Sequence, residues 1–176
     1  MRLDCKDITD LDGIGKIWAI LSSTPKTKMQ ERILLAIEWL GQARLERSRA
    51  NAILKAAIAT EILFNLRREA IGPSISSQIA ETMAHVVGGS VEVKLMIEKE
   101  MKRLYGLRSD VTHRGTVDFS EGDIRLLMTL ASDAIMVLLT RAPYKDFASE
   151  DQFVEHLNIV KYSAPSPAAV VRITEG

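Results

Sequence analysis

Apolar residues that recur at helical spacing, in runs bounded by strong stop signals, are the feature of this sequence that most limits its fold. The clearest run spans residues 48–70 and ends at Ile71-Gly72-Pro73, a combination that terminates helices. Its apolar stripe consists of Ile53, Leu54, Ala57, Ile58, Ile62 and Leu66. Strand signals are nearly absent, so the pattern predicts an all-α fold.

The same periodicity predicts helices over residues 26–46 and 74–87, the second of which is closed by Gly88-Gly89. A weaker helical pattern covers residues 149–160. The connections between the runs are short, which keeps consecutive helices adjacent. We therefore expect an antiparallel helical bundle of about five to six helices.

The longest predicted helix runs over residues 90–114. It opens on a serine, which is a favourable N-cap, and Gly115 can supply a left-handed C-cap. Ser120 and Asp123 resemble a capping box for the next helix, over residues 121–141. The caps predict a turn between these two helices.

The length of 176 residues is typical of one domain and allows a substantial core. The chain is 47% hydrophobic and 26% charged, which excludes wholesale disorder. We expect a helical domain over residues 26–162, preceded by an entry segment over 1–25 whose structure the sequence leaves open. A flexible C-terminal tail is expected over residues 163–176.

The charges of the chain balance, since lysine and arginine number 23 and aspartate and glutamate also number 23. The chain as a whole therefore has no field that would attract nucleic acid non-specifically. Only 5% of the residues are aromatic, which argues against a base-stacking platform. Any RNA binding must be local.

Several expectations concern compartment and cofactors. The single cysteine, Cys5, has no disulfide partner and no metal-ligand cluster around it, which favours a reducing compartment. No signal-peptide pattern and no long apolar stretch is found. His85 and His156 lack partners arranged as a metal motif, which favours structural or solvent roles. We expect a cytoplasmic protein without a membrane span, a metal or another cofactor.

His113 differs from the other histidines because Arg108, Asp110 and Arg114 crowd the same helix end. A histidine can transfer protons near neutral pH, and an arginine presents a charged planar fork to phosphate oxygens. The same residues also suit an ordinary helix C-terminus, where cations interact favourably with the helix dipole and the free carbonyls. The residues alone leave both interpretations open.

The surrounding sequence resembles the HEPN superfamily, and more closely its Apea-like branch. In that family, a helix with a sequence like Ala-Thr-Glu-Ile-Leu at residues 59–63 precedes a helix that ends in Leu-Tyr-x-x-Arg-Ser-x-x-x-His-x-Gly. This chain matches the second pattern over residues 104–115, with Arg114 as a tolerable variation between the histidine and the glycine. The resemblance covers about residues 28–141.

Many HEPN proteins are metal-independent endoribonucleases and dimerise with their motifs facing one another. The resemblance implies Arg108 and His113 as catalytic residues, an RNA substrate and a homodimer with the helix 90–114 near its two-fold axis. It also suggests a toxin or antiphage effector with an antitoxin or regulatory protein partner. Two alternatives are a HEPN dimer that binds RNA, nucleotide or a partner protein without cleavage, and a purely structural helical adaptor.

Helix geometry constrains this interpretation, because positions five apart are rotated by about 140° around an ideal helix. Either the helix distorts, or Arg108 and His113 belong to a site shared between two chains. Glu61 lies in the apolar stripe of its own helix, where an unpaired carboxylate is costly. We expect it to pair with a cation, Arg108 being preferred, or to reach water from the border of the stripe.

Asp110 either orients a positive group of the site or forms an exposed pair with the arginine four residues later, which is the simpler interpretation. The basic residues that could hold RNA backbone are Lys99, Lys102, Arg103 and Arg114. Acidic residues are interspersed among them, so solvated helix faces explain the same residues equally well.

Overall fold

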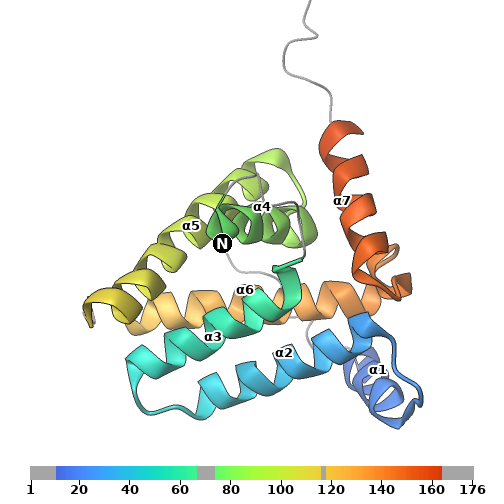
Figure 1. Cartoon of the computed structure of the whole chain (residues 1–176), viewed down its shortest axis with the longest axis horizontal. Coiled ribbons are helices and arrows are strands. Elements are labelled where there is room, and N and C mark those ends of the chain that lie inside the picture. Colours follow the sequence, from blue (N-terminus) through green and yellow to red (C-terminus); the bar gives the residue numbers. More distant parts are fainter. Residues whose placement is uncertain (1–10, 67–73, 116–117, 164–176) are drawn as a thin grey trace, which may run out of the picture.

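Seven α-helices and one short 3₁₀ helix form the described part of the chain, residues 11–66, 74–115 and 118–163, in a computed structural model (Figure 1). They are α1 (Leu11–Ser22), α2 (Lys28–Leu45), α3 (Arg49–Phe64), α4 (Ile75–Val87), α5 (Val91–Arg114), α6 (Glu121–Thr140), η2 (Tyr144–Asp146) and α7 (Glu150–Ser163). These residues contain no strand, which confirms the all-α prediction. The six predicted helices correspond to α2 to α7, and the additional helix α1 lies in the segment that the sequence left open.

Capping interactions within a few residues set the boundaries of α5 and α6. The Val93 amide donates to the Ser90 side chain at the start of α5, and Gly115 ends the helix with a φ of 64°. Glycine adopts this left-handed conformation without steric cost. At the start of α6, the Asp123 amide donates to Ser120 Oγ at 3.2 Å and the Ser120 amide donates to the Asp123 carboxylate at 2.8 Å. These caps confirm the predicted boundaries.

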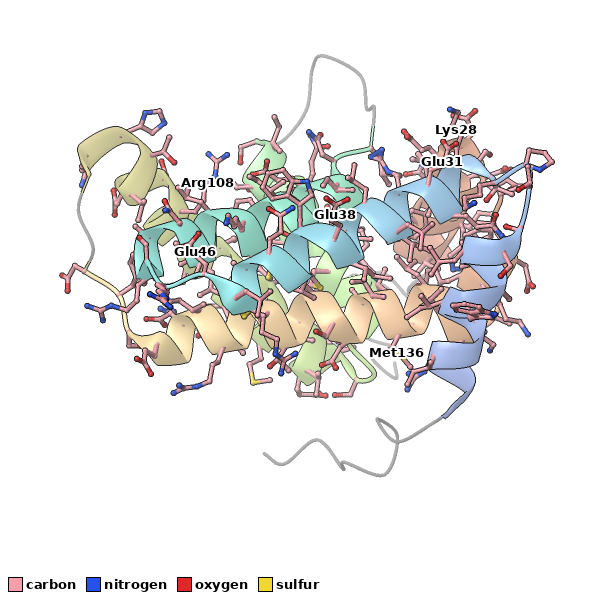
Figure 2. The ribbon with its side chains drawn as sticks, turned by 90° about the horizontal axis from the view of Figure 1, so that it is seen from below. Lys28, Glu31, Glu38, Glu46, Arg108 and Met136 are labelled. Carbon is pink, nitrogen blue, oxygen red and sulfur yellow. The ribbon has the colours of Figure 1, made fainter. Side chains whose placement is uncertain are left out.

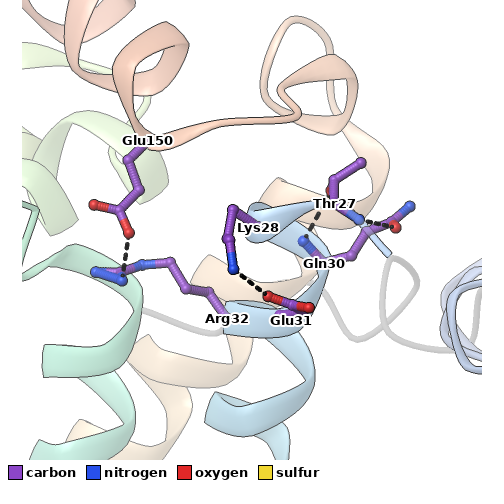
Figure 3. Close-up of polar contacts among 6 residues, drawn as sticks. All are labelled: Thr27, Lys28, Gln30, Glu31, Arg32 and Glu150. Atoms are coloured by element: carbon purple, nitrogen blue, oxygen red, sulfur yellow. Dashed lines mark hydrogen bonds and ion pairs between the residues drawn. The ribbon is translucent and has the colours of Figure 1, made fainter. Parts of the chain in front are cut away.

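The first two turns of α2 contact α7 and the residue that follows α3 (Figure 3). Thr27 and Gln30 form a capping box that begins α2. Arg32, in the second turn of α2, donates to the Glu150 carboxylate of α7 at 2.8 Å and to the Asn65 carbonyl after α3, also at 2.8 Å. One guanidinium therefore ties α2 to two segments that are distant in the sequence.

α3 ends earlier than the sequence predicted. Its last residue is Phe64, and Asn65 leaves the helical conformation with a ψ of 73°, whereas the apolar pattern predicted a helix to about residue 70. The Asn65 carbonyl accepts its hydrogen bond from Arg32, a tertiary contact that replaces a partner in a further helical turn. The predicted end at residue 70 and the Gly-Pro stop lie outside the described residues, as do residues 164–176 of the predicted tail.

α6 is the central helix of the core. It contacts each of the helices α1 to α5, with α2 and α3 along one side of it and α4 and α5 along the other (Figure 1). Its buried residues are Ile124, Leu127, Leu130, Ala131, Ala134, Ile135, Val137, Leu138 and Leu139. Burying each large side chain contributes roughly 1.5–3 kcal/mol. α3 presents small residues to the same core, since Ala56, Ala57 and Ala59 are fully buried.

α1 packs across the C-terminal part of α6. A Cβ at Gly13 would lie 2.6 Å from the terminal carbon of Met136, so glycine allows this close approach (Figure 2). Ile14 and Trp18 of α1 lie away from this contact, and both are largely exposed. Only a narrow strip of α1 therefore contributes to the core, which explains why its periodicity was a weak signal.

The turn between α4 and α5 depends on Gly88. A Cβ there would lie 2.5 Å from the Ala84 carbonyl oxygen and 2.6 Å from the Lys94 side chain, whereas a Cβ at Gly89 would meet nothing within 4 Å. We expect Gly88→Ala to lower the free energy of unfolding by about 1–3 kcal/mol. The matched variant Gly89→Ala should change it by less than about 0.5 kcal/mol. Urea denaturation measures both, and equal effects would contradict this account of the turn.

Candidate functional site

The two segments that carry the HEPN resemblance meet at the interface of α3 and α5. The hydroxyls of Thr60 and Tyr105 lie 2.6 Å apart, and both residues are buried. Thr60 also donates to the Ala57 carbonyl at 2.7 Å, which leaves its oxygen free to accept from Tyr105. This buried bond aligns α5 against α3. The sequence contains no signal for it, because each hydroxyl lies in an otherwise apolar stripe.

Arg108 follows Tyr105 by about one helical turn and pairs with Glu61. Its Nη2 lies 3.2 Å from Glu61 Oε1, with 31% of the arginine side chain and 26% of the glutamate side chain exposed. The Arg108 side chain lies beside α3 (Figure 2). Its Nε is buried and has no hydrogen-bond partner. The predicted pair between Glu61 and Arg108 is confirmed. The alternative prediction, that Glu61 reaches water from the border of the apolar stripe, is also partly correct because Glu61 is not fully buried.

His113 lies in the last turn of α5 and is exposed. α5 is α-helical without interruption from residue 91 to residue 114, so the helix does not distort between Arg108 and His113. The two residues are therefore separated by about 140° of rotation and about 7.5 Å of rise. Arg108 faces α3 and His113 faces solvent, and one chain does not bring them to a common point.

Of the two roles expected for Asp110, the structure shows the exposed pair with Arg114. One of its carboxylate oxygens lies 3.3 Å from Arg114 Nη1 on the next turn, and 73% of the arginine side chain is exposed. An exposed pair of this kind contributes little to stability. Asp110 is directed to Arg114 and not to Arg108.

The predicted basic surface of α5 is largely neutralised by neighbouring acids. Lys102 pairs with Glu98 at 2.6 Å, and Arg103 binds Glu100 at 2.9 Å and Asp123 at 2.7 Å. The hydrogen bond to Asp123 is the main cause that raises the pKa of Arg103. Lys99 is exposed and has no ion pair in the described part of the chain. Three of the four predicted RNA-binding residues are thus held by carboxylates.

The other two histidines have surroundings typical of packing residues. His156 lies edge-on against Tyr144, with ring centroids 5.2 Å apart, and also contacts Phe147. His85 is partly buried on α4, and this burial lowers its pKa. No group of three histidine, cysteine, aspartate or glutamate side chains that could hold a metal ion occurs within residues 11–66, 74–115 and 118–163.

Comparisons with known proteins do not assign this chain to a family. No family model matches the sequence, and neither a curated protein nor a solved structure was found to be similar to the chain. Among the described helices, none combines the length and the apolar character needed to cross a bilayer.

The buried Tyr105 predicts a pH dependence of stability. Burial raises the pKa of its hydroxyl above the ordinary value of about 10. The folded chain thus favours the neutral phenol. The contribution of the neutral phenol to the free energy of unfolding is fully present below about pH 10 and is lost as the pH rises further. Urea unfolding between about pH 8 and pH 11 should show a loss of up to about 1.4 kcal/mol per pH unit above pH 10 from this group. Tyr105→Phe should lack that component, and parallel curves for the two chains would contradict it.

The Glu61–Arg108 pair should stabilise the fold more than an exposed pair does. A double-mutant cycle with Glu61→Gln and Arg108→Gln should give a coupling free energy of about 1 kcal/mol, because the pair is partly shielded from water. The matched cycle uses Lys28 and Glu31, an exposed pair at 3.3 Å on α2. Its coupling should stay below about 0.5 kcal/mol. Equal couplings in the two urea-unfolding cycles would show that the shielding has no effect.

Proposed function

We propose that this chain is a metal-independent endoribonuclease of the HEPN type, with a site formed by two copies. The observation that carries the proposal is the position of Arg108, whose guanidinium is held by Glu61 at 3.2 Å yet remains partly open to solvent. The contacts Thr60–Tyr105 and Glu61–Arg108 join the two segments that resemble the family. These contacts support a likeness that extends beyond the spacing of one arginine and one histidine.

Arg108 and His113 have the chemistry that RNA cleavage by 2′-hydroxyl attack requires. A base removes the proton of the 2′-hydroxyl, the oxygen attacks the adjacent phosphorus, and the bond from phosphorus to the 5′ oxygen breaks as that oxygen gains a proton. His113 is suited to proton transfer, and Arg108 is suited to stabilise the negative charge on the phosphorane. The products are a 2′,3′-cyclic phosphate and a 5′-hydroxyl, and the scheme requires no metal.

A homodimer would supply the geometry that one chain lacks. Leu95 and His113 lie about five helical turns apart and therefore share one face of α5. Leu95 is 62% exposed, and Val91, one turn earlier, is 68% exposed. Exposed apolar side chains on this face favour contact with a second copy. Such a contact would place His113 in the interface between the two copies.

The second candidate function is a dimer that binds RNA, nucleotide or a partner protein without cleaving it. The observation that favours this alternative is the neutralisation of charge around the motif, since Glu61 occupies Arg108 and carboxylates hold Lys102 and Arg103. A non-catalytic chain needs no free guanidinium. Cleavage assays separate the two functions directly.

The proposed biological setting follows from the family alone. We propose a cytoplasmic toxin or antiphage effector that an antitoxin or another regulatory protein restrains. A gene for such a partner beside the gene of this chain would support the setting, and co-purification of the two products would test it.

RNA cleavage in the presence of a chelator tests the leading proposal. The wild-type chain should cleave mixed RNA in EDTA and leave cyclic phosphate ends, whereas Arg108→Ala and His113→Ala should each reduce the rate by about 100-fold or more. Lys28→Ala, a change of an exposed residue on the far end of α2, is the matched control and should cleave normally. Cleavage that survives both site substitutions would eliminate this site.

Mixing the two inactive variants tests the shared site. If Arg108 of one copy acts with His113 of the other, a heterodimer of Arg108→Ala and His113→Ala retains one intact pair. Random re-association should then restore up to about a quarter of the wild-type activity. No recovery in mixed dimers, verified by mass spectrometry, would contradict a site shared between copies.

A further inference from the structure

A second concentration of positive charge lies away from the motif, in a cleft between the α2–α3 turn and the first turns of α6. Four arginines line it, namely Arg44, Arg47, Arg49 and Arg125. The cleft has a volume of about 220 Å³, well above the ~15 Å³ that a single water needs. The arginines come from the last turn of α2, the turn after it, the first turn of α3 and the second turn of α6. No sequence motif pointed to them.

Three of the four arginines at this cleft have no carboxylate partner within the described residues. Arg44 and Arg47 have no ion pair within the described residues. Arg49 donates to a backbone carbonyl, that of Phe119, at 3.4 Å and has no ion pair with the carboxylates that the structure describes. A backbone carbonyl satisfies a donor without neutralising its charge, so these three guanidinium groups keep their attraction for anions.

The two carboxylates at the cleft do not cancel this charge. Glu46 is held by Lys55 at 2.7 Å and accepts from the Ser48 amide at 3.1 Å, so it is already neutralised by a cation outside the arginine set. Glu121 contacts Arg125 at 3.2 Å, but both side chains are 72% exposed. A pair that exposed is weak and opens readily for a stronger anion. An excess of positive charge therefore remains.

The arrangement suits a phosphodiester backbone. Guanidinium groups bind phosphate oxygens through two parallel hydrogen bonds, and four of them around an open cleft can contact successive phosphates of one strand. No aromatic side chain lines the cleft, so base stacking is absent and sequence-independent binding is expected. Attraction to this cleft is local and is compatible with zero net charge on the chain.

The position of the cleft connects it to the candidate catalytic residues. The α2–α3 turn, the start of α6 and the C-terminal end of α5 lie at the same end of the bundle (Figures 1 and 2). The bond from Arg49 to Phe119 ties the start of α3 to the segment that follows α5. We infer that this arginine cleft binds the phosphate backbone of single-stranded RNA and holds the strand beside the end of α5 that carries His113. The inference rests on the proposed function, because RNA is the substrate proposed there.

Binding measured without cleavage tests the inference. The probe is a fluorescein-labelled single-stranded RNA with 2′-O-methyl groups, which lacks the attacking hydroxyl, and anisotropy is measured at several salt concentrations. The double variant Arg44→Gln/Arg47→Gln should bind roughly tenfold more weakly and lower the magnitude of the slope of log K against log salt by about 1.4. The matched control, Lys28→Gln/Lys145→Gln, removes the same charge from exposed residues at the opposite end of α2 and should bind like the wild type. Unchanged thermal melting verifies the fold of each variant.

Four results would overturn the inference: no binding by the wild-type chain, normal binding by the cleft variant, equal losses in the cleft and control variants, or displacement of the probe by adenosine monophosphate at equal phosphate concentration. The outcome is separate from that of the cleavage assay. Weakened binding by the cleft variant together with no cleavage by the wild type would refute the nuclease and leave the cleft intact. Normal binding and cleavage by the cleft variant would refute the cleft and leave the nuclease intact.

Discussion

The buried hydrogen bond between Thr60 and Tyr105 fixes the alignment of α3 and α5, and the candidate site depends on that alignment. A shift of one helix along the other would leave the Tyr105 hydroxyl without a partner in the core, at a cost of about 1–3 kcal/mol. Arg108 lies about one turn beyond Tyr105, so the same alignment brings its guanidinium to Glu61. A neutral bond in the core thus positions the charged pair at the edge of the core.

Partial burial sets the character of the Glu61–Arg108 pair. A fully buried pair would be too costly to open, and a fully exposed pair would hold the guanidinium only weakly. With about a third of Arg108 and a quarter of Glu61 exposed, the pair lies between these limits. In the proposed nuclease, a substrate phosphate can therefore compete with Glu61 for the guanidinium. The same contact both orients Arg108 and restrains it.

Zero net charge conceals an uneven distribution of charge. Three basic residues of α5 each pair with an acid three or four positions away on the same helix, and this local pairing neutralises them. They are Lys102, Arg103 and Arg114. Arg44, Arg47 and Arg49 of the cleft lie in or next to the α2–α3 turn and have no ion pair within the described residues, and Arg125 has the exposed pair with Glu121. Attraction for an anion depends on the local excess and not on the total. The proposed RNA-binding surface therefore lies beside the motif helix and not along it.

The sequence by itself determined the helical class and the boundaries of α5 and α6, because periodicity and caps act between residues only a few positions apart. It also led to the partner of Glu61, since a carboxylate in an apolar stripe requires a cation. Tertiary structure alone decided the end of α3, through a guanidinium from α2, and the assembly of four arginines from separate segments into one cleft. These two features depend on contacts between residues far apart in the sequence, so no local pattern predicts them. The separation of Arg108 and His113 within one chain, by contrast, follows from local helix geometry, because α5 is helical without interruption.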